Sequence, residues 1–194
     1  MYSDYPYKII LASASPRRQE LLKLLGFNFD VEIKSIDEEI IENLSPTEVA
    51  LDIAIKKSEA FNIENYDKNT LIITADTVVA VDNKILGKPK NAKEAFEMLN
   101  QLSDKTHEVI TGICIKTNDF TDIFSSKTYV TFCKISKSEI NYYIEHYKPF
   151  DKAGSYGIQE WIGLGFISSI NGSYTNVVGL PTDLILRKLK GYLM

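Results

Sequence analysis

The sequence contains few of the residues on which redox, metal and triad sites are built. Its 194 residues include two cysteines, Cys114 and Cys133, and two histidines, His107 and His146. The cysteines lie in apolar, strand-like runs without the spacing of metal ligands, so we interpret both as buried free thiols. The histidines lie in unrelated contexts, and neither supports a hydrolase triad.

Long apolar runs and an excess of basic charge are also missing. No run reaches the roughly 18 residues that a membrane-spanning helix needs, and residues 1–6 lack the apolar core of a signal peptide. We therefore expect a cytoplasmic protein with no membrane partner. The formal net charge is −4, which argues against nucleic acid polymers as partners. A site for a smaller polyanion must then be a local cluster of Lys and Arg.

Two common nucleotide-binding motifs are absent. The sequence has no Gly-x-x-x-x-Gly-Lys-Ser/Thr loop, and no Gly-x-Gly-x-x-Gly follows a strand, so neither a P-loop kinase nor a Rossmann dehydrogenase is indicated. Apolar residues make up 44% of the chain and charged residues 25%, with no low-complexity tract or internal repeat. The length and composition predict one globular domain over residues 1–194, which can consist of two closely joined lobes.

Periodicity and capping signals divide the chain into alternating strands and helices. We expect strands at residues 8–11, 29–33, 70–81, 85–86, 108–116 and 123–135, and helices beginning after Ser15, Ser45, Asn91, Ser136 and within residues 179–183. The pairs Asp82-Asn83 and Asn171-Gly172 predict hairpins. In the last helix, we expect Leu184, Leu186 and Leu189 to pack inward.

The first predicted helix begins with an unusual charge pattern. Ser15 stands where an N-cap belongs, and Pro16 suits the first helical position. Arg17 and Arg18 follow, although cations in a first turn oppose the helix dipole by roughly 0.3–1 kcal/mol per charge. Two arginines beside free backbone N–H groups and serine hydroxyls would suit a polyphosphate. From the residues alone, a solvated first turn remains an equal alternative.

A carboxylate stands in the middle of a long, strongly apolar predicted strand. Asp76 lies between the runs 70–75 and 78–81, and its burial costs free energy unless a cation or hydrogen bonds satisfy it. This context indicates a functional role rather than a surface turn. Lys57 falls on the buried stripe of the second helix, where it either reaches solvent at the core boundary or points into a cleft. The acidic patch Asp37–Glu39 is, by pattern alone, a solvated loop.

Seven motifs then fall in a recognisable order. They are Ser13-x-Ser15-Pro-Arg-Arg-x-Glu-Leu-Leu, Ala75-Asp-Thr77, Gly87-Lys-Pro89, Thr111-Gly112, Asp151-Lys-Ala-Gly154, Tyr156-Gly-Ile-Gln159 and Val178-Gly-Leu-Pro181. Over nearly the whole chain, this set resembles the Maf family of nucleoside triphosphate pyrophosphatases, also called septum formation inhibitor proteins. The resemblance implies an α/β fold, with an elongated mixed β-sheet flanked by helices and two lobes around a central cleft, similar to the inosine triphosphatase (HAM1-like) fold.

The resemblance also implies an activity and a set of site residues. The expected reaction cleaves a nucleoside triphosphate between its α and β phosphates, giving the monophosphate and pyrophosphate, with a divalent cation (Mg or Mn), in a homodimer. Asp76 is implied as the proton acceptor and Glu38 as its catalytic partner, and these two carboxylates would also hold the metal. The implied substrate-binding residues are Ser13, Arg17, Arg18, Lys57 and Lys88 for the phosphates, and Arg17, Thr77 and Gln159 for selection of the base.

The preferred base follows from two of these motifs. Asp151-Lys-Ala-Gly followed by Tyr156-Gly-Ile-Gln is typical of the subfamily that prefers dTTP and UTP. Many members continue with Gly, whereas this chain has Glu160-Trp161-Ile162, which can reshape the base pocket or add a carboxylate near it. A nucleotide-sensing regulator of cell division is the alternative function, and a phosphatase that releases inorganic phosphate is a third. The pair of Glu38 and Asp76 favours hydrolysis, because a sensor needs the cations but not the carboxylates.

Overall fold

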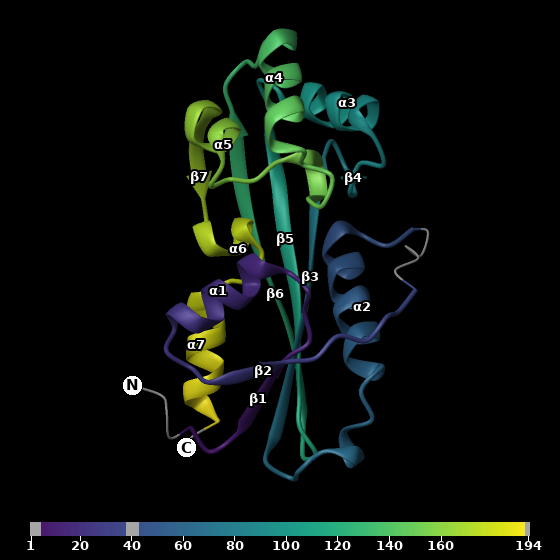
Figure 1. Cartoon of the computed structure of the whole chain (residues 1–194), viewed down its shortest axis with the longest axis vertical. Helices are drawn as coiled ribbons and strands as arrows, with labels where there is room; N and C mark the ends of the chain where they lie inside the picture. Colours follow the sequence, from purple (N-terminus) through teal and green to yellow (C-terminus); the bar gives the residue numbers. More distant parts are fainter. Residues whose placement is uncertain (1–4, 38–42, 193–194) are drawn as a thin grey trace.

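Three long strands, β3, β5 and β6, run along the molecule in the computed structural model, which describes residues 5–37 and 43–192 (Figure 1). The strands are β1 Lys8–Leu11, β2 Phe29–Val31, β3 Thr70–Val81, β4 Lys84–Leu86, β5 Thr106–Lys116, β6 Thr121–Phe132 and β7 Ile167–Asn171. The helices are α1 Pro16–Leu24, α2 Pro46–Glu59, α3 Ala92–Leu102, α4 Lys137–Tyr147, α5 Trp161–Phe166, α6 Tyr174–Val178 and α7 Thr182–Gly191, with short 3₁₀ turns η1 Ile63–Asn65 and η2 Ala153–Ser155.

The seven strands form one mixed sheet, as predicted. Its order is β2-β1-β3-β5-β6-β7, and β4 pairs with β3. β1 runs parallel to β2 and β3, and the remaining pairs are antiparallel. β1 pairs with residues 70–73 of β3, and β4 pairs with residues 79–81 along the same edge. In the described part of the chain, residues 74–78 of β3 therefore have no strand partner on that edge.

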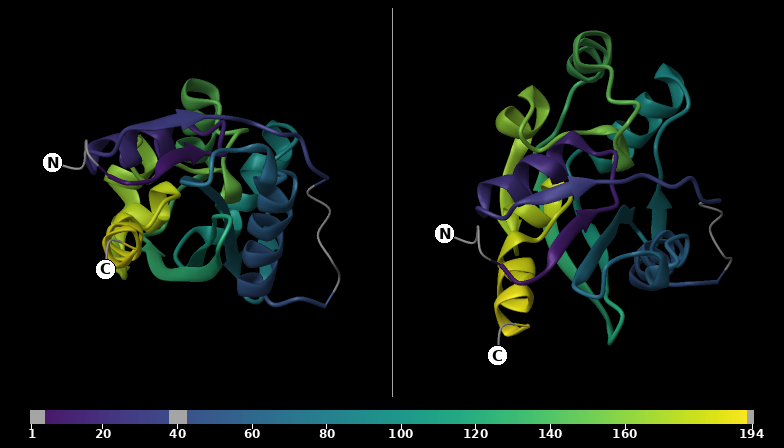
Figure 2. Two further views of the ribbon diagram at one scale, coloured as in Figure 1. Left: turned by 90° about the horizontal axis from the view of Figure 1, so that it is seen from below. Right: turned by 60° about the horizontal axis from the view of Figure 1, so that its bottom comes forward.

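Helices cover both faces of the sheet (Figure 2). On one face, Ala50 of α2 packs in a cluster with Val78 of β3. On the other face, Leu22 of α1 and Ile185 of α7 pack in a cluster with Ile73 of β3. Because successive side chains of a strand point to opposite faces, neighbouring residues of β3 reach different helix layers.

Two lobes share the long strands, as the sequence predicted. The first lobe comprises β1, β2, α1, α2 and α7, and the second comprises β4, α3, α4, α5 and η2 (Figure 1). The second lobe has its own core around Leu99, Phe132 and Tyr143. The prediction of one domain over residues 1–194 is untested and stays a prediction. No helix within the described ranges is long and apolar enough to cross a membrane.

Local capping and turn chemistry agree with the sequence. Ser45 and Ser136 each begin a helix with a complete capping box. Asp82 and Asn83 have φ values of 50° and 60°, the left-handed conformations that a tight two-residue hairpin requires. The helix α1 ends at Leu24, and Gly26 follows it with a φ of 83°.

The predicted hairpin at Asn171-Gly172 is wrong. Asn171 ends β7, which pairs antiparallel with β6, and the chain then passes through Gly172 into α6. Position 172 requires a glycine because of its backbone conformation and its close contact with β6. Its φ is 131°, and a Cβ there would lie 2.7 Å from the Thr128 hydroxyl oxygen. The dipeptide signalled a positive φ correctly, but it could not identify which strand lies alongside.

Several further details depart from the predictions. In α7 the fully buried residues are Ile185 and Leu189, whereas Leu184 and Leu186 are half-buried. Ile185 and Leu189 are four residues apart, which places both on the same face of the helix. Cys133 is exposed because it follows the end of β6, and only Cys114 is a buried thiol. The strand predicted at residues 29–33 ends at Val31, and that predicted at 123–135 spans Thr121–Phe132.

Candidate active site

A cleft of about 550 Å³ opens beside the uncovered edge of β3, between β1 and β4. Eight of the nine site residues predicted from the sequence line it: Ser13, Arg17, Arg18, Lys57, Asp76, Thr77, Lys88 and Gln159. The ninth, Glu38, lies outside the described residues. The first lobe contributes Ser13, Arg17, Arg18 and Lys57, the shared strand β3 contributes Asp76 and Thr77, and the second lobe contributes Lys88 and Gln159. The tertiary structure therefore gathers side chains from five separate parts of the sequence around one cavity.

The cleft concentrates positive charge on an acidic protein. Its described lining contains six cationic side chains and two anionic ones, a net of +4, whereas the whole chain carries −4. The cations are Arg17, Arg18, Lys34, Lys57, Lys88 and Lys152, and the anions are Asp76 and Asp151. This is the local Lys and Arg cluster that a polyanion site requires in a chain of this charge.

Asp76 meets its cation at the centre of the cleft. The Lys57 Nζ atom of α2 lies 2.7 Å from Asp76 Oδ1, and the two side chains are 17% and 14% exposed. The open choice for Lys57 is thereby resolved in favour of the cleft. Gly112 of β5 lies opposite Asp76 in register, and a Cβ there would be only 2.3 Å from the Ala50 carbonyl oxygen. The missing side chain lets α2 approach the sheet closely enough for this pair to form.

The start of α1 forms another wall. The Ser13 hydroxyl oxygen accepts from the backbone N–H of Ser15 at 3.2 Å, and Gln19 donates to the Ser13 carbonyl at 3.1 Å. Ser15 Oγ in turn accepts from the backbone N–H of Arg18 at 3.4 Å. These bonds hold the turn at the positive end of the helix dipole, beside the cavity.

The two arginines of α1 behave differently. Arg18 donates to the carbonyl oxygens of Gly179 and Ala75 at 2.7 and 2.9 Å, and to the Thr77 hydroxyl at 2.9 Å. Its guanidinium thus ties α1 to the open edge of β3 and to the loop before α7. Arg17 instead crosses the cleft and pairs with Asp151 of the second lobe at 3.0 Å. Of the two, Arg17 is better placed to exchange its partner for a phosphate.

Thr77 and Asp76 face opposite sides of β3. The Thr77 hydroxyl lies 2.9 Å from that of Thr111, which donates to the Asn176 carbonyl at 3.2 Å. Asp76 and Thr77 nevertheless both line the cleft, because the cavity surrounds the strand edge that neither β1 nor β4 covers. This edge explains how consecutive residues can serve one site.

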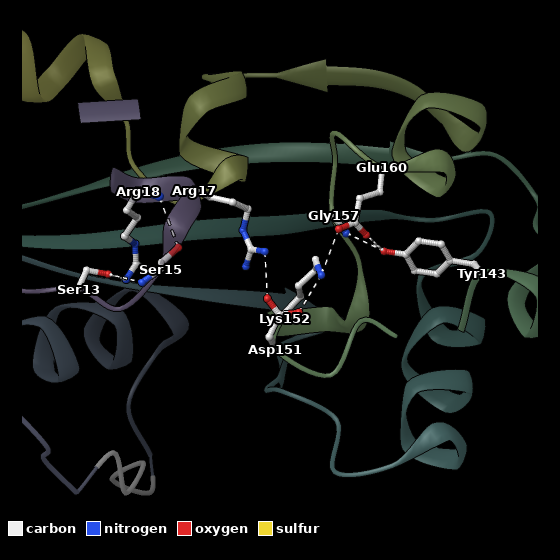
Figure 3. A network of polar contacts seen from close by, with 9 residues as sticks. All are labelled: Ser13, Ser15, Arg17, Arg18, Tyr143, Asp151, Lys152, Gly157 and Glu160. Carbon is white, nitrogen blue, oxygen red and sulfur yellow. Dashed lines mark hydrogen bonds and ion pairs between the residues drawn. The ribbon is translucent and has the colours of Figure 1, made fainter. Parts of the chain in front are cut away.

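A polar network that the sequence did not predict extends from Arg17 into the second lobe (Figure 3). Asp151 joins Arg17 to Lys152, whose Nζ atom lies 2.7 Å from Asp151 Oδ1 and 3.1 Å from Glu160 Oε1. Glu160 also accepts a hydrogen bond from Tyr143. The available signals were the Asp151-Lys152 motif and the unusual Glu160. Tyr143 gave none, because tyrosines at helical spacing are typical of core residues, and it is buried.

The network changes the acidity of its members. Burial by itself raises the pKa of Asp151, but hydrogen bonds from Lys152 and Arg17 outweigh it and hold the pKa below its usual range. Burial, followed by the hydrogen bond to Glu160, raises the pKa of Tyr143 far above its usual value. At neutral pH, Asp151 is therefore a carboxylate and Tyr143 a protonated donor.

Lys34 is another cleft cation that the sequence did not single out. Its Nζ atom lies 4.4 Å from the ring centroid of Phe61 and 5.7 Å from that of Tyr66. Both Lys34 and Phe61 line the cavity. Lys88 and Gln159 are exposed on the facing wall. An extended anion could therefore be contacted from both lobes.

The donor set restricts the kind of metal site that is available. Within the described ranges, no group of three or more His, Cys, Asp and Glu side chains could hold a metal. Asp76 supplies a cleft carboxylate, and its Oδ1 atom already accepts from Lys57. Mg²⁺ commonly takes one or two carboxylates and completes its shell with waters and substrate phosphates. The residues present fit that arrangement rather than an all-protein cage.

Comparison with known proteins identifies the family of this chain. A family model described as Maf-like protein matches residues 8–192. The chain belongs to the Maf family. A relative of this Maf protein from Flavobacterium psychrophilum, named dTTP/UTP pyrophosphatase, is 53% identical over 92% of this chain and 91% of its own. Relatives with the same name from Flavobacterium johnsoniae and Parabacteroides distasonis are 49% and 48% identical, over 94% and 96% of both chains.

Solved structures of Ham1 proteins align with part of this Maf protein. Those from Staphylococcus aureus and Coxiella burnetii align with 64% and 66% of this chain and 71% and 74% of theirs, with TM-scores of 0.44 and 0.45 and identities of 21% and 13%. The fold assignment rests on the strand order and helix layers of the chain itself.

Proposed function

We propose that this chain hydrolyses dTTP and UTP to the monophosphate and pyrophosphate in a reaction that depends on a divalent cation. The observation that carries the proposal is the ion pair of Asp76 and Lys57 inside a cleft whose described lining has a net charge of +4. Its relatives named dTTP/UTP pyrophosphatase, about 50% identical over nearly the whole chain, support the choice of reaction and base.

Arg17, Lys57 and Lys88 bind the triphosphate in this proposal. A nucleoside triphosphate carries about four negative charges at neutral pH, comparable with the net charge of the cleft lining that the structure describes. Arg17 offers a planar pair of donors to phosphate oxygens, and the lysines supply movable point charges. Arg18 contributes its charge to the field, while its hydrogen bonds to Ala75 and Gly179 hold the wall in place. Ser13 and the first turn of α1 provide further donors.

Cleavage requires water to attack the α phosphorus while the bond to the bridging oxygen of the leaving pyrophosphate breaks. Asp76 accepts a proton from that water or orients it, and the hydrogen bond from Lys57 fixes the direction of the carboxylate. Asp76 and Glu38 would hold the divalent cation, which when bound neutralises charge on the phosphate oxygens. Positioning and charge neutralisation supply most of the acceleration in such a site.

Gln159 and Thr77 select the base in this proposal. Gln159 is exposed at the cleft wall of the second lobe, and its amide offers both a donor and an acceptor to a base edge. Thr77 is held by Arg18 and Thr111, so it shapes the pocket beside the strand edge. A homodimer and a cytoplasmic location remain expectations from the family resemblance and the sequence.

The experiment is pyrophosphate release from dTTP, UTP, CTP, dATP and 7-methyl-GTP with Mg²⁺ or Mn²⁺. We expect dTTP and UTP to be the best substrates. Asp76→Asn should lower kcat at least about 100-fold, whereas Asp82→Asn, on the exposed hairpin that ends the same strand, should match the wild type.

The outcomes separate the candidate functions. Wild-type turnover in Asp76→Asn, with metal still bound, would remove both roles assigned to the carboxylate. Nucleotide binding without release of any product would favour the sensor over the enzyme. Release of inorganic phosphate in place of pyrophosphate would identify a phosphatase.

A further inference from the structure

Gln159 projects from a short turn that is closed by the backbone. The N–H of Glu160 donates to the carbonyl oxygen of Gly157 at 3.0 Å, and Gln159 occupies the third position of this four-residue turn. The side chain of Gln159 is exposed beside the cavity. Its direction therefore depends on how firmly the two ends of the turn are held.

The Tyr143 hydroxyl ties both ends of this turn to α4. Tyr143 donates its hydroxyl proton to Glu160 Oε2, and the same hydroxyl oxygen accepts from the backbone N–H of Gly157 at 3.1 Å. A Cβ on Gly157 would lie 2.7 Å from the carboxyl carbon of Glu160, so the carboxylate sits directly against the glycine. Burial and Glu160 both raise the pKa of Tyr143, which keeps its hydroxyl a donor.

Glu160 also holds the ammonium group of Lys152. Lys152 is only 8% exposed, and two of its three N–H donors are directed at Asp151 and Glu160, at 2.7 and 3.1 Å. The residue nevertheless lines the cleft. A buried ammonium is costly unless it is paired, so the two carboxylates offset the burial of Lys152 and fix its position.

We propose that Glu160, together with Tyr143, is a positioning residue for base selection. The two residues fix the turn that presents Gln159, and Glu160 holds Lys152 as a donor at the cleft wall. This inference rests on the proposed function and specifies its substrate class, pyrimidines with two ring carbonyls. Uracil and thymine present an acceptor where cytosine presents an amino donor. An ammonium N–H therefore attracts the carbonyl of UTP or dTTP and opposes the amino group of CTP.

The test measures kcat and KM for pyrophosphate release from UTP and CTP with Glu160→Ala, Glu160→Gln and Tyr143→Phe. In Glu160→Ala, we expect KM for UTP to rise about tenfold and kcat to stay within about threefold. The preference for UTP over CTP, in kcat/KM, should fall about tenfold. Glu160→Gln keeps an acceptor for Tyr143 but loses the charge opposite Lys152, so its effects should be smaller in the same direction.

Matched controls lie on the same helix as Tyr143. Glu145→Ala removes an exposed carboxylate of α4, and Tyr147→Phe removes a hydroxyl one turn further along. Both should match the wild type in kcat, KM and base preference.

Four outcomes decide the inference. A lower UTP preference with a raised KM, in Glu160→Ala or in both conservative variants, supports it. An unchanged preference in folded variants overturns it and leaves the proposed function intact, as does a loss confined to kcat. If the wild type releases no pyrophosphate from any triphosphate, the proposed function fails and the inference fails with it. The conservative variants, Glu160→Gln and Tyr143→Phe, carry the test if Glu160→Ala does not fold.

Discussion

Gly112→Ala tests whether the close approach of α2 to the sheet builds the candidate active site. The added Cβ would lie 2.3 Å from the carbonyl oxygen of Ala50 and 2.7 Å from the backbone nitrogen of Leu51, whereas ordinary contacts begin at 3.4 Å. All of these atoms are backbone, so no side chain can rotate away, and α2 must move by roughly 1 Å. Overpacking of this kind costs about 1–3 kcal/mol.

The same displacement should damage the site. Lys57 lies two helical turns beyond Ala50, and in the wild-type structure its Nζ atom is 2.7 Å from Asp76 Oδ1. A shift of about 1 Å in a catalytic arrangement can cost up to about 100-fold in rate. We therefore expect Gly112→Ala to lose at least tenfold in kcat for pyrophosphate release, in addition to its loss of stability.

Urea unfolding and thermal unfolding measure the first effect. In a domain of this size, each kcal/mol lost from the free energy of unfolding lowers Tm by about 2–4 °C. Gly165→Ala is the matched control, because a Cβ there meets no atom within 4 Å, and it should lose neither stability nor activity. If Gly112→Ala unfolds at the wild-type urea concentration and keeps its rate, the packing argument is refuted.

Two further predictions concern charge and pH. Lys57→Met should lower the rate of pyrophosphate release at least about 100-fold and the free energy of unfolding by about 1–3 kcal/mol. The control is Lys56→Met, because Lys56 pairs with Asp52 on the helix surface, and it should change the free energy of unfolding by less than about 0.5 kcal/mol. Equal losses in both variants would contradict the role assigned to Lys57 in the cleft. Burial lowers the pKa of His107 from 6.5 to about 4, so between these values His107 binds a proton in the unfolded chain but not in the folded one. Its contribution to the free energy of unfolding should therefore fall by about 3 kcal/mol from pH 6.5 to pH 4. Urea titrations across this range measure the slope, and His107→Gln should reduce it by up to one proton; an unchanged slope would show that His107 does not titrate in this way.

Local chemistry in the sequence predicted most of the elements and one central feature of the site. Capping boxes at Ser45 and Ser136, and the turn at Asp82-Asn83, depend on residues no more than three positions apart, so they can be recognised without knowledge of the fold. The conflict of a carboxylate within an apolar strand is likewise local, and it singled out Asp76 before its partner was known.

Only the tertiary structure decided which distant groups meet. Arg17 and Arg18 are adjacent in sequence, yet one crosses to Asp151, 134 residues away, and the other binds the edge of β3 and the loop before α7. The Asn171-Gly172 dipeptide showed where the chain turns but not which strand lies beside it. Tyr143 has the helical spacing of a core residue, and nothing local distinguishes a buried hydroxyl that binds Glu160 from one that does not. Propensity and capping act over a few bonds, whereas ion pairs and hydrogen bonds across a cleft depend on how whole lobes pack.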